Sequence, residues 1–113
     1  MELSNAVRRL SALAQPNRLE VYRLLVKAGK QGIAAGDIAR ALDVAPNTLS
    51  AQLNILSNSG LVTSVREGRS IIYAADFKNM GDLLVYLVED CCNGNPEICL
   101  PIAEATKCLD GGE

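Results

Sequence analysis

The sequence has no histidine and no tryptophan, and only one phenylalanine and three tyrosines among its 113 residues. Without histidine, no imidazole can act as the general base that activates a serine or cysteine nucleophile. No strand-borne C-x-x-C redox motif is present either. We therefore expect a protein that is not an enzyme. Hydrophobic residues make up 49% of the chain and aromatic ones 4%, so the core must consist of Leu, Val, Ile and Ala, as is typical of packed helices.

Long apolar runs are also missing. No stretch reaches the roughly 20 residues that a membrane-spanning helix needs, and no signal-peptide pattern follows Met1. The sequence therefore predicts one small cytoplasmic domain, of a size at which a partner subunit often completes the core. Thiols stay reduced in the cytoplasm, where clustered cysteines indicate metal or redox chemistry more often than a disulfide framework.

Positive charge is scarce outside the first part of the chain. The formal net charge is −2, with net +4 in residues 1–30, 0 in residues 31–75 and −6 in residues 76–113. This distribution excludes a general basic coat. A nucleic-acid contact, if the chain makes one, must be local.

Four segments have apolar residues at helical spacing: 3–14, 16–28, 34–42 and 46–58. Pro16 and Pro46 each suit the first turn of a helix, and Gly60 suits the left-handed position that ends the fourth one. In the first segment Leu3, Val7, Leu10 and Ala14 share a face. In the other three we expect these residues to face inward: Leu19, Tyr22, Leu25, Val26, Ile38, Ala39, Leu42, Leu49, Leu53 and Leu56.

The periodicity changes after Gly60. Residues 61–66 and 69–74 are rich in Val, Ile, Thr and Tyr and flank Glu67-Gly68, which predicts a tight β-hairpin. A last helix then runs to about Asp90. The predicted fold is mainly α with a β-hairpin, a winged helix-turn-helix with an additional helix at each end. We expect this domain to span residues 1–92 and a cysteine-containing loop or tail to span 93–113.

The fourth helix carries a small, polar, acid-free face: Asn47, Thr48, Ser50, Ala51, Gln52 and Asn54. Asn and Gln can pair with adenine edges, Ser and Thr with phosphates or bases, and Ala with a thymine methyl group. Arg66 and Arg69 flank the hairpin tip, where they can reach phosphates or the minor groove. A polar helix face alone is more often simply solvated. Together with the preceding turn and the arginine-bearing hairpin, it predicts binding to double-stranded DNA.

Three stretches carry a family resemblance: ALAQPNRLEVYRLLV, GDIARALDVAPNTLSAQLNILSNSGLV and VREGRSIIY. Over residues 3–90 the chain resembles the arsenical-resistance repressor (ArsR/SmtB) family. The resemblance implies a homodimer, joined through its first and last helices, that binds a palindromic operator until an inducing ion releases it. Family members commonly have histidine at the position of Gln52. A winged helix that makes only protein contacts is the alternative, but it would not need arginines at the hairpin tip.

All four cysteines lie near the C-terminus: Cys91, Cys92, Cys99 and Cys108. A disulfide between adjacent cysteines is strained, so the pair is poorly placed to bond to itself. The family's cysteine pair at the start of the third helix is replaced by Ala34-Ala35-Gly36-Asp37, and its histidine-containing sites are absent. The chain resembles the arsenic repressors that have a vicinal cysteine pair at the end of the last helix and a third cysteine further on.

The chemistry of trivalent arsenic fits three of these thiols. As(III) and Sb(III) are soft and prefer sulfur, and their lone pair leaves three positions in a pyramid, which Cys91, Cys92 and Cys99 can fill. Structural zinc needs four ligands, with Cys108 as the fourth, and an adjacent pair is a poor zinc chelate. Cadmium, lead, zinc and thiol redox sensing remain alternatives. Cys108 is otherwise a spare thiol. The sequence leaves open the operator, the choice between inorganic and methylated arsenic, and whether one subunit or two form the site.

Overall fold

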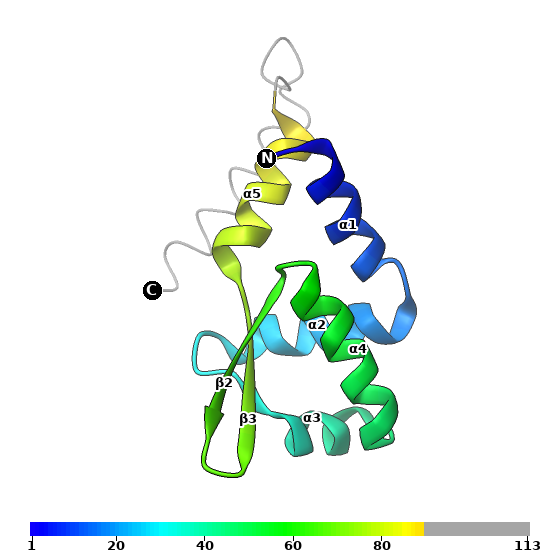
Figure 1. The fold of residues 1–113 in the computed structure, drawn as a ribbon, viewed down its shortest axis with the longest axis vertical. Coiled ribbons are helices and arrows are strands. Elements are labelled where there is room, and N and C mark those ends of the chain that lie inside the picture. The colour runs from blue at the N-terminus through cyan, green and yellow to red at the C-terminus, as the bar shows by residue number, and fades with distance from the viewer. Residues whose placement is uncertain (90–113) are drawn as a thin grey trace. The chain divides into compact units, whose positions relative to one another are not determined.

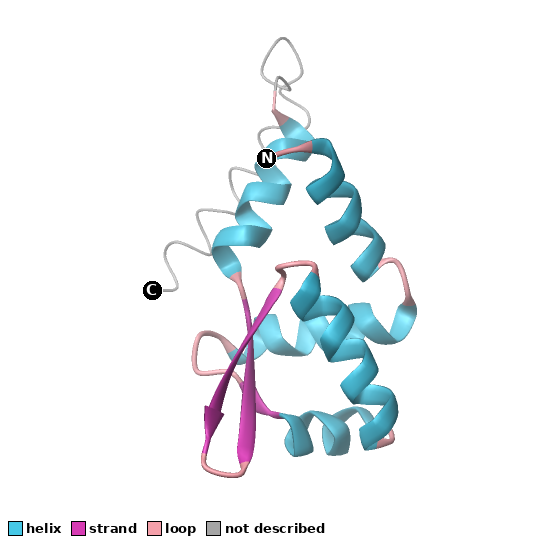
Figure 2. Ribbon diagram, in the orientation of Figure 1, coloured by secondary structure: helices cyan, strands magenta, loops and turns pink. Residues whose placement is uncertain are grey.

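The computed structural model describes residues 1–89 (Figure 1). Their elements follow the order α1 (Leu3–Leu13), α2 (Pro16–Ala28), β1 (Ile33–Ala34), α3 (Ala35–Leu42), α4 (Pro46–Asn58), β2 (Val62–Glu67), β3 (Ser70–Ala75) and α5 (Phe77–Val88). Residues Met1–Leu83 form one compact unit, and a second unit begins at Leu84, within α5. This arrangement confirms the predicted winged helix-turn-helix with a helix added at each end (Figure 2).

The sheet is antiparallel, with strand order β1-β3-β2. β2 and β3 form the predicted hairpin, paired from Val62↔Ala75 to Glu67↔Ser70. The turn is therefore Gly68-Arg69, one residue later than predicted, and Gly68 takes the positive φ of 60° that glycine allows. β1 was not predicted, because a strand of two residues is too short to show an alternating pattern.

The core is aliphatic, as predicted. Its fully buried side chains are Val21, Leu25, Ile38, Leu49, Leu53, Leu56, Leu61 and Leu83. Those of α2, α3 and α4, together with Leu61 just before β2, form one cluster with Val62 and Ala75 of the hairpin, so the helix-turn-helix and the sheet share one apolar interior. Leu83 of α5 is buried apart from this cluster. Leu19, which was expected to face inward, is 44% exposed, since the buried face of α2 runs through Val21, Tyr22 and Leu25 instead.

The large apolar side chains of α1 are exposed in the single chain. Leu3, Val7 and Leu10 are 67%, 55% and 41% accessible, whereas Ala6 and Ala12 are the buried residues of this helix. The predicted apolar face of α1 is thus present on the helix, apart from Ala14, which lies just after its end, but it is not part of this chain's core. None of the helices within residues 1–89 is long and apolar enough to cross a membrane.

Candidate nucleic-acid interface

The turn between α3 and α4 sets the direction of the second helix. Asp43 ends α3 in the left-handed conformation, with φ 53° and ψ 52°. Ala45 is extended (φ −61°, ψ 140°), as expected for a residue that precedes proline, and Pro46 is the first helical residue of α4. Ile38 of α3 and Leu49 of α4 are both buried, which fixes the two helices against one core.

The first turn of α4 presents free hydrogen-bond donors. Leu49 is the first residue of the helix whose N–H finds a backbone carbonyl, that of Ala45, and no side chain caps the helix start. The N–H groups of Asn47 and Thr48 therefore lack the intrahelical partners that later residues have. Unpaired N–H groups at the positive end of a helix favour an anion such as a phosphate.

The outer face of α4 is small, polar and exposed. Five of the six predicted DNA-contacting residues of this helix lie on it: Asn47, Thr48, Ser50, Ala51 and Asn54. The opposite face carries the buried Leu49, Leu53 and Leu56. The exposed face has no acidic side chain to repel DNA, and its hydroxyl and amide groups can bond to phosphates and base edges.

Gln52 is an exception, and its predicted position on the outer face was wrong. Its side chain is only 6% exposed, because it follows Leu49 by three residues and precedes Leu56 by four, which places it on the buried side of the helix. Its Oε1 atom has no hydrogen-bond partner within the part of the chain that the structure describes. Gln52 is therefore a buried polar residue in the single chain, and its contact with a base stays a prediction.

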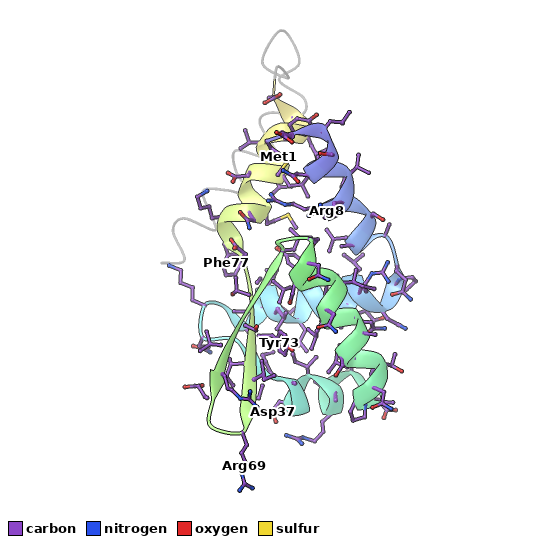
Figure 3. The ribbon with its side chains drawn as sticks, viewed as in Figure 1. Met1, Arg8, Asp37, Arg69, Tyr73 and Phe77 are labelled. Atoms are coloured by element: carbon purple, nitrogen blue, oxygen red, sulfur yellow. The ribbon has the colours of Figure 1, made fainter. Side chains whose placement is uncertain are left out.

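The hairpin supplies two exposed arginines. Arg66 lies on β2 and Arg69 in the turn, and neither side chain makes a hydrogen bond or ion pair with residues 1–89. Figure 3 shows Arg69 extending away from the tip of the hairpin. Within residues 1–83 the hairpin tip, α3 and the first turn of α4 lie at the same end (Figure 1). The only acidic residue of the hairpin, Glu67, is also exposed.

Arg40 of α3, by contrast, has a local partner. Its guanidinium forms an exposed ion pair with Asp37, one turn earlier on the same helix. Exposed pairs of this kind contribute little stability, but they neutralise the charge locally. The positive charge available at this end of the unit therefore comes from Arg66, Arg69 and the start of α4.

The predicted metal ligands lie outside the described residues. These are Cys91, Cys92 and Cys99, and Cys108 lies there too. Within residues 1–89 no three His, Cys, Asp or Glu side chains are grouped so that they can hold a metal ion.

Comparisons with known proteins agree with this geometry. A helix-turn-helix domain family matches residues 13–65, which covers α2 to most of β2. The transcriptional regulator NmtR of Mycobacterium tuberculosis is 36% identical over 75 residues, which are 66% of this chain and 60% of that protein. A homolog of the repressor SmtB from Synechocystis is 39% identical over 64 residues, 57% of this chain and 46% of that protein. The match thus spans about half of these two relatives.

A solved structure matches over a larger share. It is the homodimeric winged helix-turn-helix DNA-binding domain of Mb0332 from Mycobacterium bovis, a possible ArsR-family transcriptional regulator. It is 33% identical, covers 79% of this chain and 82% of that domain, and superposes with a TM-score of 0.64. The chain described here belongs to the ArsR/SmtB family of winged helix-turn-helix transcriptional regulators.

Proposed function

We propose that this protein is a homodimeric repressor that binds double-stranded operator DNA and leaves it when As(III) or Sb(III) binds Cys91, Cys92 and Cys99. The observation that carries the DNA-binding part is the exposed, acid-free face of α4 at the same end of the unit as Arg69. The choice of As(III) or Sb(III) as the inducer is supported by the group of three cysteines, which begins three residues after α5 ends at Val88.

DNA binding would use α4 for bases and the hairpin for the backbone. The first turn of α4, with the free N–H groups of Asn47 and Thr48, docks against a phosphate at the edge of the major groove. Ser50, Ala51 and Asn54 then face base edges. Arg66 and Arg69 contact phosphates or the adjacent minor groove, which adds affinity that depends on salt but not on sequence.

Dimerisation is supported by apolar side chains that the single chain leaves exposed. On α1 these are Leu3, Val7 and Leu10, and on α5 they are Leu84, Val85 and Leu87. Large apolar side chains that are exposed together along one helix favour protein–protein contacts in soluble proteins. A two-fold dimer carries two copies of α4, so its operator should have palindromic half-sites about one helical turn apart, roughly 10 base pairs, or a multiple of it.

Trivalent arsenic fits the cysteines by number and by type. Three thiolates match the three coordination positions of As(III) or Sb(III), and soft sulfur is the preferred donor. Cadmium, lead, zinc or oxidation of the thiols is the alternative inducer for the same fold. In the sequence the cysteines follow α5 and are separate from α4 and from the hairpin. We infer that ion binding shifts the dimer between two arrangements with different operator affinities, so the dimer persists after release.

The test is a titration of operator binding. The reduced protein is bound to a duplex taken from upstream of its own gene, and arsenite, antimonite, cadmium, zinc or an oxidant is added while anisotropy is recorded. We expect release by arsenite and antimonite at the lowest concentrations, with sedimentation still reporting a dimer. The repressor assignment fails if the reduced protein ignores this duplex at low salt. The arsenic assignment fails if cadmium, zinc or the oxidant acts first.

A further inference from the structure

Arg9 of α1 bridges two elements that are distant in the sequence. Its Nε donates to the backbone oxygen of Ser59 at 3.2 Å, and its Nη1 donates to the backbone oxygen of Asn79 at 2.9 Å. Ser59 caps the C-terminal end of α4, and Asn79 lies in the first turn of α5. One guanidinium thus joins three helices within residues 1–83.

Asn79 completes this connection with its own side chain. Its Nδ2 donates to the backbone oxygen of Gly60 at 2.7 Å and to Asp76 Oδ2 at 3.1 Å. Its backbone N–H donates to Asp76 Oδ1 at 2.9 Å, so Asp76 caps the start of α5. The N–H of Asp76 in turn donates to the backbone oxygen of Leu61 at 2.8 Å. The bond to Gly60 joins α5 to the corner between α4 and β2, and the bond to Asp76 holds the Asn79 side chain at the start of α5.

The corner itself is shaped to accept these donors. Gly60 has φ 90°, and a Cβ at this position would lie 3.3 Å from Asn79 Nδ2 and 3.5 Å from Arg9 Nη2. The carbonyl groups at the end of a helix carry partial negative charge, which favours a cation such as the Arg9 guanidinium. A planar guanidinium that donates to two fixed carbonyls also constrains angle, which the flexible ammonium of a lysine does not.

This cluster is at the opposite end of α4 from the first turn that faces DNA. The helix has 13 residues, so the two ends are about 20 Å apart. A helix behaves as a rigid rod over this length, and a small tilt at its C-terminal end displaces Asn47 and Thr48 the most. Recognition of base edges requires side chains held to within about 0.5 Å.

We propose that Arg9 and Asn79 are positioning residues for operator recognition: they hold the end of α4 to α1 and α5, and thereby fix the direction in which α4 enters the major groove. The inference rests on the proposed DNA-binding function. Neither residue contacts DNA in this scheme. Their contribution is to selectivity, because a helix that is free to tilt still meets phosphates but no longer meets the correct base edges.

The experiment uses the full chain, three single variants and the double variant of Arg9 and Asn79. Arg9→Gln removes the guanidinium bonds to the backbone oxygens of Ser59 and Asn79, and Asn79→Ala removes the side-chain bonds to Gly60 and Asp76. Arg8→Gln is the matched control, because Arg8 is the neighbouring arginine on α1, is exposed, and makes no hydrogen bond or ion pair with residues 1–89. Each protein is bound to a duplex that the wild-type protein selects from a randomised library, and to a scrambled duplex of the same length, over a range of salt concentrations. Thermal unfolding is recorded in parallel.

We expect Arg9→Gln and Asn79→Ala each to weaken binding to the selected duplex about tenfold, a loss of about 1.4 kcal/mol, while binding to the scrambled duplex changes less than twofold. The slope of log affinity against log salt should stay as in the wild type. The double variant should lose little more than either single one, because both act in one network. Arg8→Gln should behave as the wild type.

Four other results overturn the inference, each in a different way. A salt slope lowered by about one, with equal loss on both duplexes, means that Arg9 contacts a phosphate directly. If affinity for both duplexes falls equally and the unfolding temperature falls with it, the cluster only stabilises the fold. If both variants still prefer the selected duplex over the scrambled one as strongly as the wild type does, the positioning role is rejected while the proposed DNA binding stands. If the wild-type protein selects no duplex at all, the proposed function fails and this inference fails with it.

Discussion

The backbone N–H of Val44 donates to the carbonyl oxygen of Ala39 at 3.0 Å and closes the end of α3. Between them Asp43 is left-handed, and its N–H donates to the carbonyl of Arg40 at 3.4 Å. This pair of bonds is a Schellman motif, in which the left-handed residue is usually glycine. Asp43 is the only non-glycine residue with positive φ among residues 1–89, and it lies at the point that sets the angle between α3 and α4.

Asp43→Gly should therefore stabilise the fold. Glycine relieves the left-handed strain and removes a negative charge from the negative end of α3. Glycine also gives the unfolded chain more freedom, which opposes these gains, so we expect a net increase of about 1 kcal/mol in the free energy of unfolding. Asp43→Asn is the matched control: it removes the charge and tolerates the left-handed conformation, so we expect about half the gain. Urea denaturation midpoints measure both. A lower midpoint in either variant would show that the Asp43 carboxylate has a favourable contact.

The sequence predicted the fold well because helix ends carry local signals. Pro16, Pro46 and Gly60 mark boundaries that the structure confirms within a residue, and the leucines of α4 are spaced so that one face must be buried. The hairpin was predicted from its composition, and the one-residue error in its turn arose because both Glu67-Gly68 and Gly68-Arg69 contain the glycine that such turns need.

The errors and omissions at the candidate site have a different cause. Gln52 is polar, so composition placed it with Asn54 and Ser50, whereas its spacing from Leu49 and Leu56 places it inside. The connection from Arg9 to Ser59 and Asn79 spans 50 and 70 residues. No local pattern predicts which of several arginines meets a distant carbonyl, since tertiary packing decides it.

Burial of Tyr22 predicts a specific alkaline instability. Its hydroxyl has no hydrogen-bond partner among the described residues. Burial, with a smaller contribution from Asp76, raises its pKa from 10.0 to about 12. The folded chain holds this proton more tightly than the unfolded chain, so the free energy of unfolding is unaffected below about pH 10 and falls as pH rises from about 10 to about 12.

Tyr22→Phe should remove that alkaline loss. At pH 7 it should leave stability unchanged or raise it by up to about 1 kcal/mol, because the buried hydroxyl loses its hydration without gaining a partner. Urea denaturation of both proteins between pH 7 and pH 11.5 measures the difference. Parallel stability curves across this range would mean that the tyrosine hydroxyl is not desolvated.

Two polar residues of α4 differ in burial: Gln52 is buried, whereas Asn54 is exposed. Gln52→Met fills a similar volume without an unpaired amide oxygen, so we expect higher stability and an unchanged base preference. Asn54→Ala, on the exposed face, should instead relax preference at one or two operator positions, each by about 1–3 kcal/mol. Urea denaturation measures the stability of Gln52→Met, and selection from randomised duplexes measures the base preference of both variants. An altered preference in Gln52→Met would show that the side chain turns outward on DNA.

Arg69 should contribute affinity without sequence preference. Its side chain extends from the hairpin tip and has no partner within residues 1–89. Arg69→Ala should weaken binding to all duplexes alike and reduce the salt slope by about one, since one phosphate contact is lost. Arg69→Lys is the control, because it keeps the charge and should keep most of the slope. If Arg69→Ala changes base preference and leaves the slope intact, the hairpin reads bases and not phosphates.

The number of thiols that a trivalent arsenical can bond to predicts which cysteines each proposed inducer needs. Inorganic arsenite offers three replaceable positions, so Cys91, Cys92 and Cys99 can all bond to it. A singly methylated trivalent arsenical offers only two, which the vicinal pair alone can fill. In the proposed site, the third thiol would be what makes binding of the inorganic ion effective, because neither water nor serine replaces a bond from soft sulfur.

Serine substitutions at each cysteine should therefore give different responses in a reporter strain, although all four variants should still repress. Cys91→Ser and Cys92→Ser should respond to no arsenical, because each removes a ligand that both inducers need. Cys99→Ser should lose most of its response to arsenite and antimonite but keep part of its response to the methylated form. Cys108→Ser, the matched control outside the set of three, should respond as the wild type does. A full arsenite response in Cys99→Ser would remove Cys99 from the site and leave a two-thiol site in which inorganic and methylated arsenic are bound through the same pair.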